Sequence, residues 1–346
     1  MQYDDSVLTR TERRIFALRT LYSSAGYRSY RMRKFEDYDL YSRAGYRSYR
    51  MRKFEDYDLY SRNKDFLLSD RVITFTDTNG RLKALKPDVT LSIVKNIEDK
   101  PSCLNRLFYD ENVYRVSGST GTFREIMQMG LECIGDAGNP VAAEVIDLAE
   151  QSLALVAEDY DYILRVSDID MLTLLVDGMS DSGSVRSGLL RLISAKNLHG
   201  IESLCSENDI PEEKCRTLTE LLKVYGTPPE VMPRITEICK GTEAEEEVGE
   251  LADVLRGLYP ENGEKDSRKI VLDFSIVGDT NYYNGMAFEG YIDGIPECVL
   301  IGGRYDKLMR RMKKKSRAIG FAIYMDTLGM LGRTAGDRAI ENFYDR

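Results

Sequence analysis

The segment from Arg124 to Gly135, REIMQMGLECIG, constrains the fold most, because its side chains alternate with the two-residue period of a β-strand. One face of this predicted strand is apolar and carries Met127, Met129, Leu131 and Cys133. Gln128 and Glu132 share the opposite face, with only Gly130 between them. A strand that merely faced water would more often carry Lys or Thr there, whereas Gln, Gly and Glu suit a grip on a small amino group. We therefore predict a strand with one face in the core and an open floor for a ligand on the other.

A second segment, NYYNGMAFEGY from Asn281 to Tyr291, is predicted to form the other wall of the same pocket. Its Tyr282 and Tyr283 are expected to face Gln128 and Glu132. The two segments are far apart in the chain, so the fold must bring them together.

Strand patterns occupy both ends of the chain, and a long helical stretch lies between them. Before that stretch the sequence predicts a helix at Thr11–Tyr22, a YRSYRM strand, a hairpin of Val72–Phe75 and Leu82–Leu85 around Asn79-Gly80, strands at Arg106–Tyr109 and Asn112–Val116, a helix at Pro140–Ala157 and a strand at Tyr162–Val166. Helical periodicity dominates from Asp170 to about Tyr259. Beyond it the sequence predicts a strand at Lys269–Val277, a hairpin around Asp293-Gly294 and a strand at Ala318–Tyr324. We expect a sheet protein interrupted by a helical insertion.

Residues 25–43, AGYRSYRMRKFEDYDLYSR, recur without a change as residues 44–62. Solenoid repeats are many diverged copies that stack, whereas one perfect tandem copy indicates a recent duplication, an assembly error or a deliberate insertion. Only one copy can fill the strand position that follows the first helix. The other is expected to loop out, add an edge strand or pair with a neighbouring chain.

Composition excludes several classes of function. The net charge of -9 and the pI of about 5.1 argue against a nucleic-acid binder that relies on broad electrostatics. The six cysteines are widely spaced without a CxxC pair, which predicts reduced thiols in the cytoplasm rather than a zinc knuckle or a disulfide framework. The N-terminus is charged, and no apolar run approaches the roughly 18 residues of a membrane span. We expect a soluble, cytoplasmic protein.

Few motifs of catalytic chemistry are present. The single histidine, His199, has no metal-ligand partner in its helical stretch and is predicted to be structural. No GxxxxGK[ST] occurs, and the two glycines of IGGRYDKL at Ile301 are a weak phosphate signal. The basic run RRMKKKSR, Arg310–Arg317, is predicted to be a solvated loop, with a phosphate or an acidic partner as the alternative. No metal or cofactor is expected, and no acid–base pair can be singled out.

Several segments in one order resemble the catalytic core of histidyl-tRNA synthetases: ALKPDVT at Ala84, NVYRV followed by REIMQMGLE, NYYNGMAFE, GGRYDKL and AIGFAI. The resemblance covers most of the chain outside the helical stretch. It implies an α+β fold of the class II aminoacyl-tRNA synthetase type, an antiparallel sheet flanked by helices, with a helical insertion. We expect a first part of the core at 1–165, the insertion at 166–268, the second part of the core at 269–335 and a C-terminal tail at 336–346.

The resemblance also implies a pocket for histidine. The matching positions are Asp88, Thr90, Arg115, Gln128, Glu132, Tyr283 and Tyr305. Glu132 and Asp88 would meet the α-amino group, Gln128 and the tyrosine hydroxyls would hold polar edges, and Arg115 would face a carboxylate. Ordinary core tyrosines and a surface arginine are the alternative interpretation.

The departures from the synthetase pattern point away from catalysis. Histidyl-tRNA synthetases carry an arginine before the paired tyrosines, where this chain has Gly278, and a later arginine, where it has Thr327. Those arginines stabilise charge on ATP phosphates or on the activated carboxylate, and glycine and threonine supply none. Only about twenty residues follow the last core motif, without the synthetase's anticodon-binding domain, and Arg33 or Arg52 replaces a proline of the first class motif.

These departures are similar to those of the ATP phosphoribosyltransferase regulatory subunits, a paralogous family, and SAKNLHGIESL at Ser194–Leu204 resembles the helical segment of that family. The resemblance implies a non-catalytic protein of histidine biosynthesis that pairs with the short-form catalytic subunit, supports its activity and transmits allosteric feedback by histidine. It also implies a homodimer within a hetero-oligomer, without a cofactor, a membrane or nucleic acid.

Two alternatives stay open. One is an active histidyl-tRNA synthetase fragment. The other is a binding or modification protein of the same fold that acts on a different amino acid or on a protein side chain.

Overall fold

The computed structural model describes residues 9–30, 54–62, 72–116, 121–259, 268–277 and 282–331. Its centre is a nine-stranded sheet in the order β1-β5-β6-β12-β11-β10-β7-β9-β8. These strands are β1 (Arg28–Tyr30), β5 (Asn105–Val116), β6 (Phe123–Gly135), β12 (Arg317–Tyr324), β11 (Leu300–Arg304), β10 (Asn284–Ile292), β7 (Tyr162–Asp168), β9 (Ile270–Asp273) and β8 (Tyr225–Gly226). The pairs from β5 to β7 are antiparallel, as predicted, while β1 pairs with β5 and β9 with β7 in parallel.

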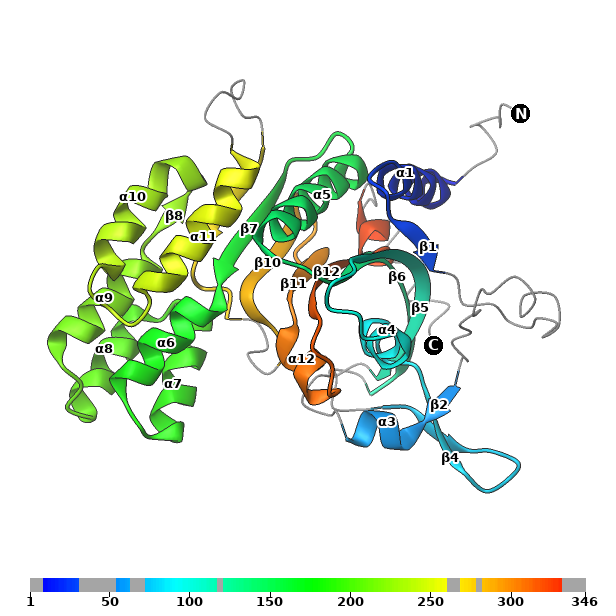
Figure 1. Ribbon diagram of the computed structural model, residues 1–346, viewed down its shortest axis with the longest axis horizontal. Helices are drawn as coiled ribbons and strands as arrows, with labels where there is room; N and C mark the ends of the chain where they lie inside the picture. The colour runs from blue at the N-terminus through cyan, green and yellow to red at the C-terminus, as the bar shows by residue number, and fades with distance from the viewer. Residues whose placement is uncertain are drawn as a thin grey trace.

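The strand order explains how distant segments of the sequence meet (Figure 1). β6 precedes the helical stretch and pairs with β12, which follows it, from Gln128 opposite Tyr324 to Gly135 opposite Arg317. β7 and β10 likewise pair across the stretch. Both predicted walls of the pocket therefore belong to one sheet, with β12 and β11 between them.

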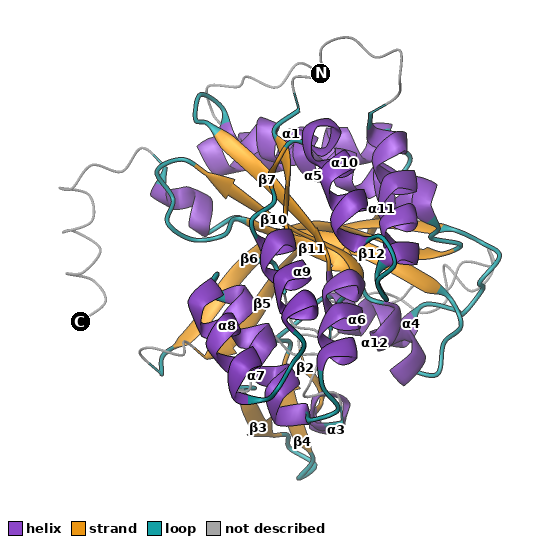
Figure 2. Ribbon diagram, turned by 90° about the vertical axis from the view of Figure 1, so that its left-hand side faces the viewer, coloured by secondary structure: helices purple, strands orange, loops and turns teal. Residues whose placement is uncertain are grey.

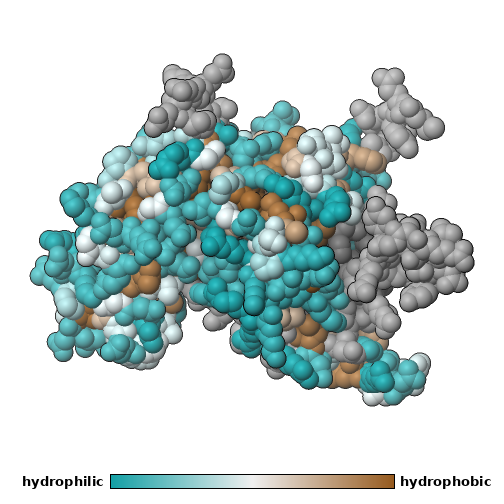
Figure 3. All heavy atoms as spheres, viewed as in Figure 1, coloured by the Kyte–Doolittle hydropathy of each residue, from teal (hydrophilic) through white to brown (hydrophobic). Residues whose placement is uncertain are grey.

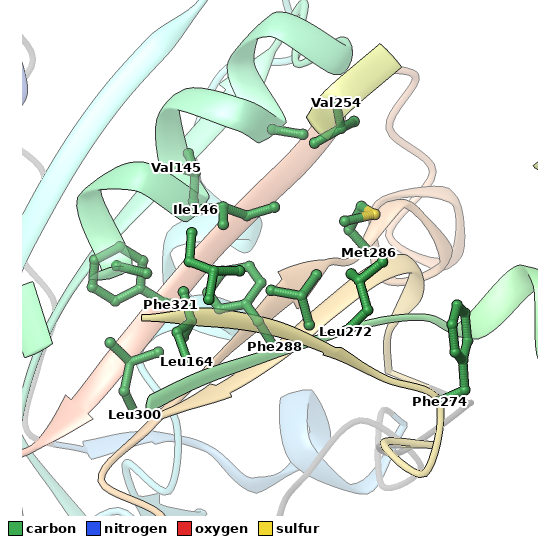
Figure 4. Packing of buried hydrophobic residues seen from close by; sticks show 14 of the residues in the cluster. Val145, Ile146, Leu164, Val254, Leu272, Phe274, Met286, Phe288, Leu300 and Phe321 are labelled. Atoms are coloured by element: carbon green, nitrogen blue, oxygen red, sulfur yellow. The ribbon is translucent and has the colours of Figure 1, made fainter. Parts of the chain in front are cut away.

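Helices α1 (Arg10–Ser24) and α5 (Asn139–Ala157) cover one face of this sheet (Figures 1 and 2). Ile146 of α5 packs there against Leu164, Phe288 and Phe321 (Figure 4). The two phenylalanine rings lie 6.3 Å apart in an edge arrangement. The apolar residues of β6 lie in the same core, which confirms the predicted alternation: Met129, Leu131 and Cys133.

The opposite face of the sheet carries a second core beneath α4 (Thr90–Asn96) and α12 (Asp306–Arg311). It buries apolar residues of both helices, such as Leu91 and Leu308, beside several tyrosines. The polar face of β6 therefore turns toward protein rather than water.

The helical stretch packs against β10, β9 and β8 at one end of the sheet (Figure 1). Its helices are α6 (Ile169–Met179), α7 (Gly183–Ser194), α8 (Leu198–Glu207), α9 (Glu212–Leu222), α10 (Pro228–Cys239) and α11 (Glu245–Leu258). The chain breaks where predicted, because Thr227 caps α10 and two prolines occupy its first turn. The short strand β8, absent from the sequence prediction, extends the sheet by pairing with β9.

The strand predicted at Lys269–Val277 is shorter than expected. β9 ends at Asp273, whose carboxylate accepts hydrogen bonds from the amide and hydroxyl of Ser275 at 3.0 and 2.7 Å. These local bonds turn the backbone away from the ladder.

Both predicted hairpins are present. β3 (Thr74–Thr76) and β4 (Leu82–Leu85) pair around Asn79-Gly80, and β10 and β11 pair beyond Asp293-Gly294. Gly80 and Gly294 have φ of 76° and 84°, the left-handed conformation that their turns need.

The duplicated segment contributes a different part from each copy. Residues 28–30 of the first copy form β1, while the second copy supplies β2 (Phe54–Asp56) and α3 (Tyr57–Ser61). β2 pairs with β4 in a separate three-stranded sheet. The described residues 25–30 and 54–62 amount to one copy apart from RMRK, and residues 31–53 lie outside the described part.

Deleting residues 44–62 is therefore expected to leave the fold intact, because the product retains the sequences of β1, β2 and α3. The connection between β1 and β2 shortens from 23 residues to 4. Closing the shorter connection saves up to about 1.5 kcal/mol of chain entropy. Thermal unfolding should show an unchanged or raised melting temperature, and a large drop would show that both copies are structural.

No helix among the described residues is long and apolar enough to cross a membrane. The face shown in Figure 3 is mostly hydrophilic, with hydrophobic residues in scattered groups. The basic run Arg310–Arg317 is largely exposed, as predicted, but only its middle is a loop, because Arg310 and Arg311 end α12 and Arg317 begins β12. The Lys314 ammonium donates a hydrogen bond to the Ile97 carbonyl.

Candidate ligand-binding pocket

A polar cavity lies in the second core, between β6, β12 and the start of α4. Six of the seven predicted site residues line it: Asp88, Thr90, Gln128, Glu132, Tyr283 and Tyr305. The space that the centre of a water molecule can reach there is only ≈ 30 Å³. Such a space holds a few waters at most. The pocket is therefore formed but narrow, and an amino acid enters only if side chains move.

Glu132 lies at the centre of the pocket and is 1% exposed. The Thr90 hydroxyl donates a hydrogen bond to one carboxyl oxygen at 2.5 Å, and the Tyr305 hydroxyl donates to the other at 2.6 Å. Burial raises the pKa of Glu132 to about 8, because the two hydroxyls recover only part of the lost hydration. An incoming cation would favour the ionised form.

Gly320 on β12 leaves the space that the Glu132 side chain occupies. A Cβ at Gly320 would stand 2.0 Å from a carboxyl oxygen of Glu132 and 2.4 Å from the Leu131 carbonyl oxygen. Gly320 and Glu132 are directly paired across the two strands, so only glycine at position 320 leaves room for the Glu132 carboxylate.

Gly130 does not leave the open floor that its sequence context predicts. Tyr109 of β5 lies directly opposite and fills the gap, with its hydroxyl 2.7 Å from where a Cβ of Gly130 would stand. Tyr109 is 1% exposed. The protein's own ring, rather than a ligand, therefore covers this glycine.

Asp88 closes the side of the pocket at α4. Its carboxylate accepts a hydrogen bond from the Leu91 amide at 2.7 Å, and burial raises its pKa. Nearby Lys86 is fully buried and pairs with Glu111 at 3.2 Å. A second carboxylate thus stands beside Glu132, which suits a cationic ligand group.

Three tyrosines form the apolar wall. The rings of Tyr282 and Tyr283 lie 4.6 Å apart, and that of Tyr305 lies 6.1 Å from Tyr282. A Cβ at Gly303 would stand 2.6 Å from the Tyr283 ring, so this glycine admits the ring. Burial raises the pKa of all three phenols well above the ordinary value, which keeps their hydroxyls protonated.

Arg115, the seventh predicted residue, lies at the rim and does not line the cavity. Its Nε donates a hydrogen bond to the Pro87 carbonyl at 3.0 Å, and its guanidinium lies 5.9 Å from the centre of the Tyr324 ring. The guanidinium thus lies beside an aromatic ring at the rim, and its role toward a ligand carboxylate stays a prediction.

Sequence reasoning missed several lining residues, among them Tyr109, Ile301 and Tyr324. No periodicity could identify them, because each reaches the pocket from a neighbouring strand. The phosphate interpretation of IGGRYDKL is wrong, since Gly302 and Gly303 lie within β11 and admit aromatic rings.

The remaining predicted features lie elsewhere. His199 is exposed on α8, and Thr327 begins a short 3-10 helix, Thr327–Met330. Gly278 and Asn281 lie outside the described residues, as do both candidates for the first class motif, Arg33 and Arg52. The described part of the chain contains no group of three or more His, Cys, Asp or Glu side chains that could hold a metal. All six cysteines are free thiols.

The model of one protein family, histidyl-tRNA synthetase, matches residues 22–328. The ATP phosphoribosyltransferase regulatory subunit of Caldanaerobacter subterraneus subsp. tengcongensis is 30% identical over 256 residues, which cover 73% of this chain and 66% of that protein. The protein of the same name from Moorella thermoacetica is 29% identical, with 73% of this chain and 65% of that protein covered. The matched region spans just under two thirds of these relatives.

Solved structures show the same fold. An ATP phosphoribosyltransferase regulatory subunit/histidyl-tRNA synthetase from Bacillus halodurans superposes with a TM-score of 0.74 at 18% identity, covering 96% of this chain and 85% of that one. A chain of the ATP phosphoribosyl transferase (HisG:HisZ) complex from Thermotoga maritima gives a TM-score of 0.63 at 17% identity, covering 94% and 98%. These likenesses confirm the predicted class of fold.

Proposed function

The chain belongs to the histidyl-tRNA synthetase family, and from that premise we propose that it is a non-catalytic regulatory subunit of ATP phosphoribosyltransferase. The observation that carries the proposal is a buried acidic pocket whose described lining contains no lysine or arginine. Relatives about 30% identical to this chain carry the name of that subunit.

The charge of the lining argues against amino-acid activation. Attack of a carboxylate on ATP needs cations that hold the phosphates and the developing charge. The described lining contains the carboxyl groups of Asp88 and Glu132 but no cationic side chain, and Arg115 lies at the rim beside Tyr324. Thr327, which stands where the synthetase pattern has an arginine, has no charge to offer.

Histidine is the proposed ligand. Its ammonium group would meet Glu132 and Asp88, while Gln128, Thr90 and the hydroxyls of Tyr283 and Tyr305 would hold polar edges. Burial strengthens each of these interactions, because water no longer competes for the donors and acceptors. Arg115 would take the carboxylate from the rim, where its guanidinium lies 5.9 Å from the centre of the Tyr324 ring.

The proposed partner is the short-form catalytic subunit, joined by a homodimer of this chain within a hetero-oligomer in the cytoplasm. Feedback then requires histidine to bind one state of the assembly more tightly than another. Within the chain, we propose that residues 166–268 form the insertion between core parts at 1–165 and 269–335, with 336–346 as a tail.

Purified protein is expected to show no histidine-dependent exchange of pyrophosphate into ATP, because the described lining of the pocket has no cation for the phosphates. An active histidyl-tRNA synthetase assayed in parallel verifies the assay. Clear exchange by this chain would replace the regulatory proposal with that of a synthetase fragment.

A further inference from the structure

Tyr324 stands where the pocket opens toward its rim. It is the last residue of β12 and lies opposite Gln128 of β6. Its amide donates a hydrogen bond to the Val299 carbonyl at 2.9 Å, which holds the backbone in place. The residue lines the cavity with the buried carboxyl groups and is itself partly exposed.

Arg115 marks the neighbouring position. Its guanidinium lies 5.9 Å from the centre of the Tyr324 ring, within the range of a cation–π contact. Its Nη2 is buried without a hydrogen bond of good geometry to a described residue, although the Tyr324 hydroxyl and the Asp88 carboxylate interact with the guanidinium electrostatically. A buried donor of this kind has a large gain from an incoming anion. The carboxylate of an amino acid in the pocket is such an anion.

A group attached to that carboxylate would extend past Arg115 into the space of the Tyr324 ring. A free amino acid whose carboxylate met Arg115 would end at the guanidinium, whereas an ester or an acyl nucleotide would continue beyond it. The ring sits on a strand paired on both sides, with β11 and β6, so its Cα cannot retreat without breaking the ladder. Only the side-chain torsions of Tyr324 can relieve the contact.

We propose that Tyr324, packed against Arg115, is a specificity-determining residue that restricts the pocket to a free amino acid and excludes one whose carboxylate carries a nucleotide. This inference rests on the proposed function of the pocket as a histidine site. The Tyr324 side chain would then distinguish free histidine from histidine whose carboxylate carries a nucleotide.

The test compares calorimetric dissociation constants for histidine and for its non-hydrolysable sulfamoyl-adenosine analogue. Wild-type protein should bind the analogue at least 100-fold more weakly than histidine. Tyr324→Ala should reduce this ratio at least tenfold, and Tyr324→Phe should retain it because the ring remains. If Tyr324→Ala does not fold, Tyr324→Leu provides the same comparison with a smaller opening.

Tyr225→Ala is the matched control. Tyr225 of β8 is also a tyrosine with a cation over its ring, the Lys196 ammonium at 5.6 Å, but it lies outside the pocket. Its replacement should leave the ratio unchanged. Equal binding of the two ligands by wild-type protein, or an unchanged ratio in the folded Tyr324 variants, would overturn the inference while histidine binding still stands. Wild-type protein that binds no histidine would instead overturn the proposed function and this inference with it.

Discussion

Replacing Glu132 with glutamine is expected to weaken histidine binding by about 10- to 150-fold, the loss that follows from removing a charged partner worth roughly 1.5–3 kcal/mol. Glutamine keeps the size of the side chain and can still bond to Thr90 and Tyr305, which now donate at 2.5 and 2.6 Å. The variant thus removes charge rather than shape. Calorimetry with the twenty amino acids measures the effect.

Glu289→Gln is the control for this substitution. Glu289 lies on β10 and accepts a hydrogen bond from the Tyr291 hydroxyl at 2.7 Å, outside the pocket lining. Its replacement should leave histidine binding unchanged. Equal affinity in Glu132→Gln and wild-type protein would remove Glu132 from the site, and selective binding of another amino acid would favour a different binding function.

The Glu132→Gln substitution that weakens histidine binding is expected to raise the free energy of unfolding at pH 8. The pKa of Glu132 is raised from 4.5 to about 8, so between those values the folded state binds more protons than the unfolded state. The free energy of unfolding therefore falls as pH rises through this window, by up to about 5 kcal/mol for a shift of this size. Asp168, with its pKa raised to about 7, contributes a loss of the same sign in both proteins.

In Glu132→Gln the free energy of unfolding no longer contains the pH-dependent loss that Glu132 contributes. Urea unfolding at pH 5 and pH 8 should show a smaller decline for the variant than for wild-type protein. The variant should be the more stable of the two at pH 8. Parallel pH profiles would mean that Glu132 titrates normally and that its burial has little energetic effect.

Replacing Gly320 with alanine is expected to destabilise the fold by about 3 kcal/mol or more. The new methyl group would stand 2.4 Å from the Leu131 carbonyl oxygen, a backbone atom that cannot rotate away, and 2.0 Å from the Glu132 carboxylate. Displacement of that carboxylate should also abolish histidine binding in whatever protein remains folded. Urea denaturation and calorimetry report the two effects separately.

Gly249→Ala provides the comparison for this substitution. Gly249 lies in α11, and a Cβ there meets nothing within 4 Å. Alanine in a helix is expected to stabilise by up to about 1 kcal/mol. If Gly320→Ala were as stable as Gly249→Ala, the close approach of β12 and β6 at the pocket would be wrong.

The face of β6 that lines the pocket could be predicted from sequence, because a strand places alternate side chains on opposite faces. Met129, Leu131 and Cys133 lie in one core, and Gln128 and Glu132 lie in the pocket on the other side. The motif order added residues that alternation cannot connect, such as Asp88 and Tyr305.

The side chains that neighbouring strands place into the pocket could not be predicted from sequence. Gly130 indicated room for a ligand, but Tyr109 fills it from the neighbouring strand. The contact of the Arg115 guanidinium with the Tyr324 ring was not predicted either. Such contacts depend on strand register and side-chain direction, which a single sequence does not reveal.

The most direct test of the regulatory proposal is co-expression of this chain with a short-form ATP phosphoribosyltransferase catalytic subunit from the same genome. The proposal predicts a complex that survives size-exclusion chromatography, a gain in phosphoribosyl transfer over the catalytic subunit alone, and inhibition of that gain by histidine. Glu132→Gln in the same complex should keep the gain and reduce the inhibition. Absence of a complex, together with no gain in transferase activity, would contradict the proposal.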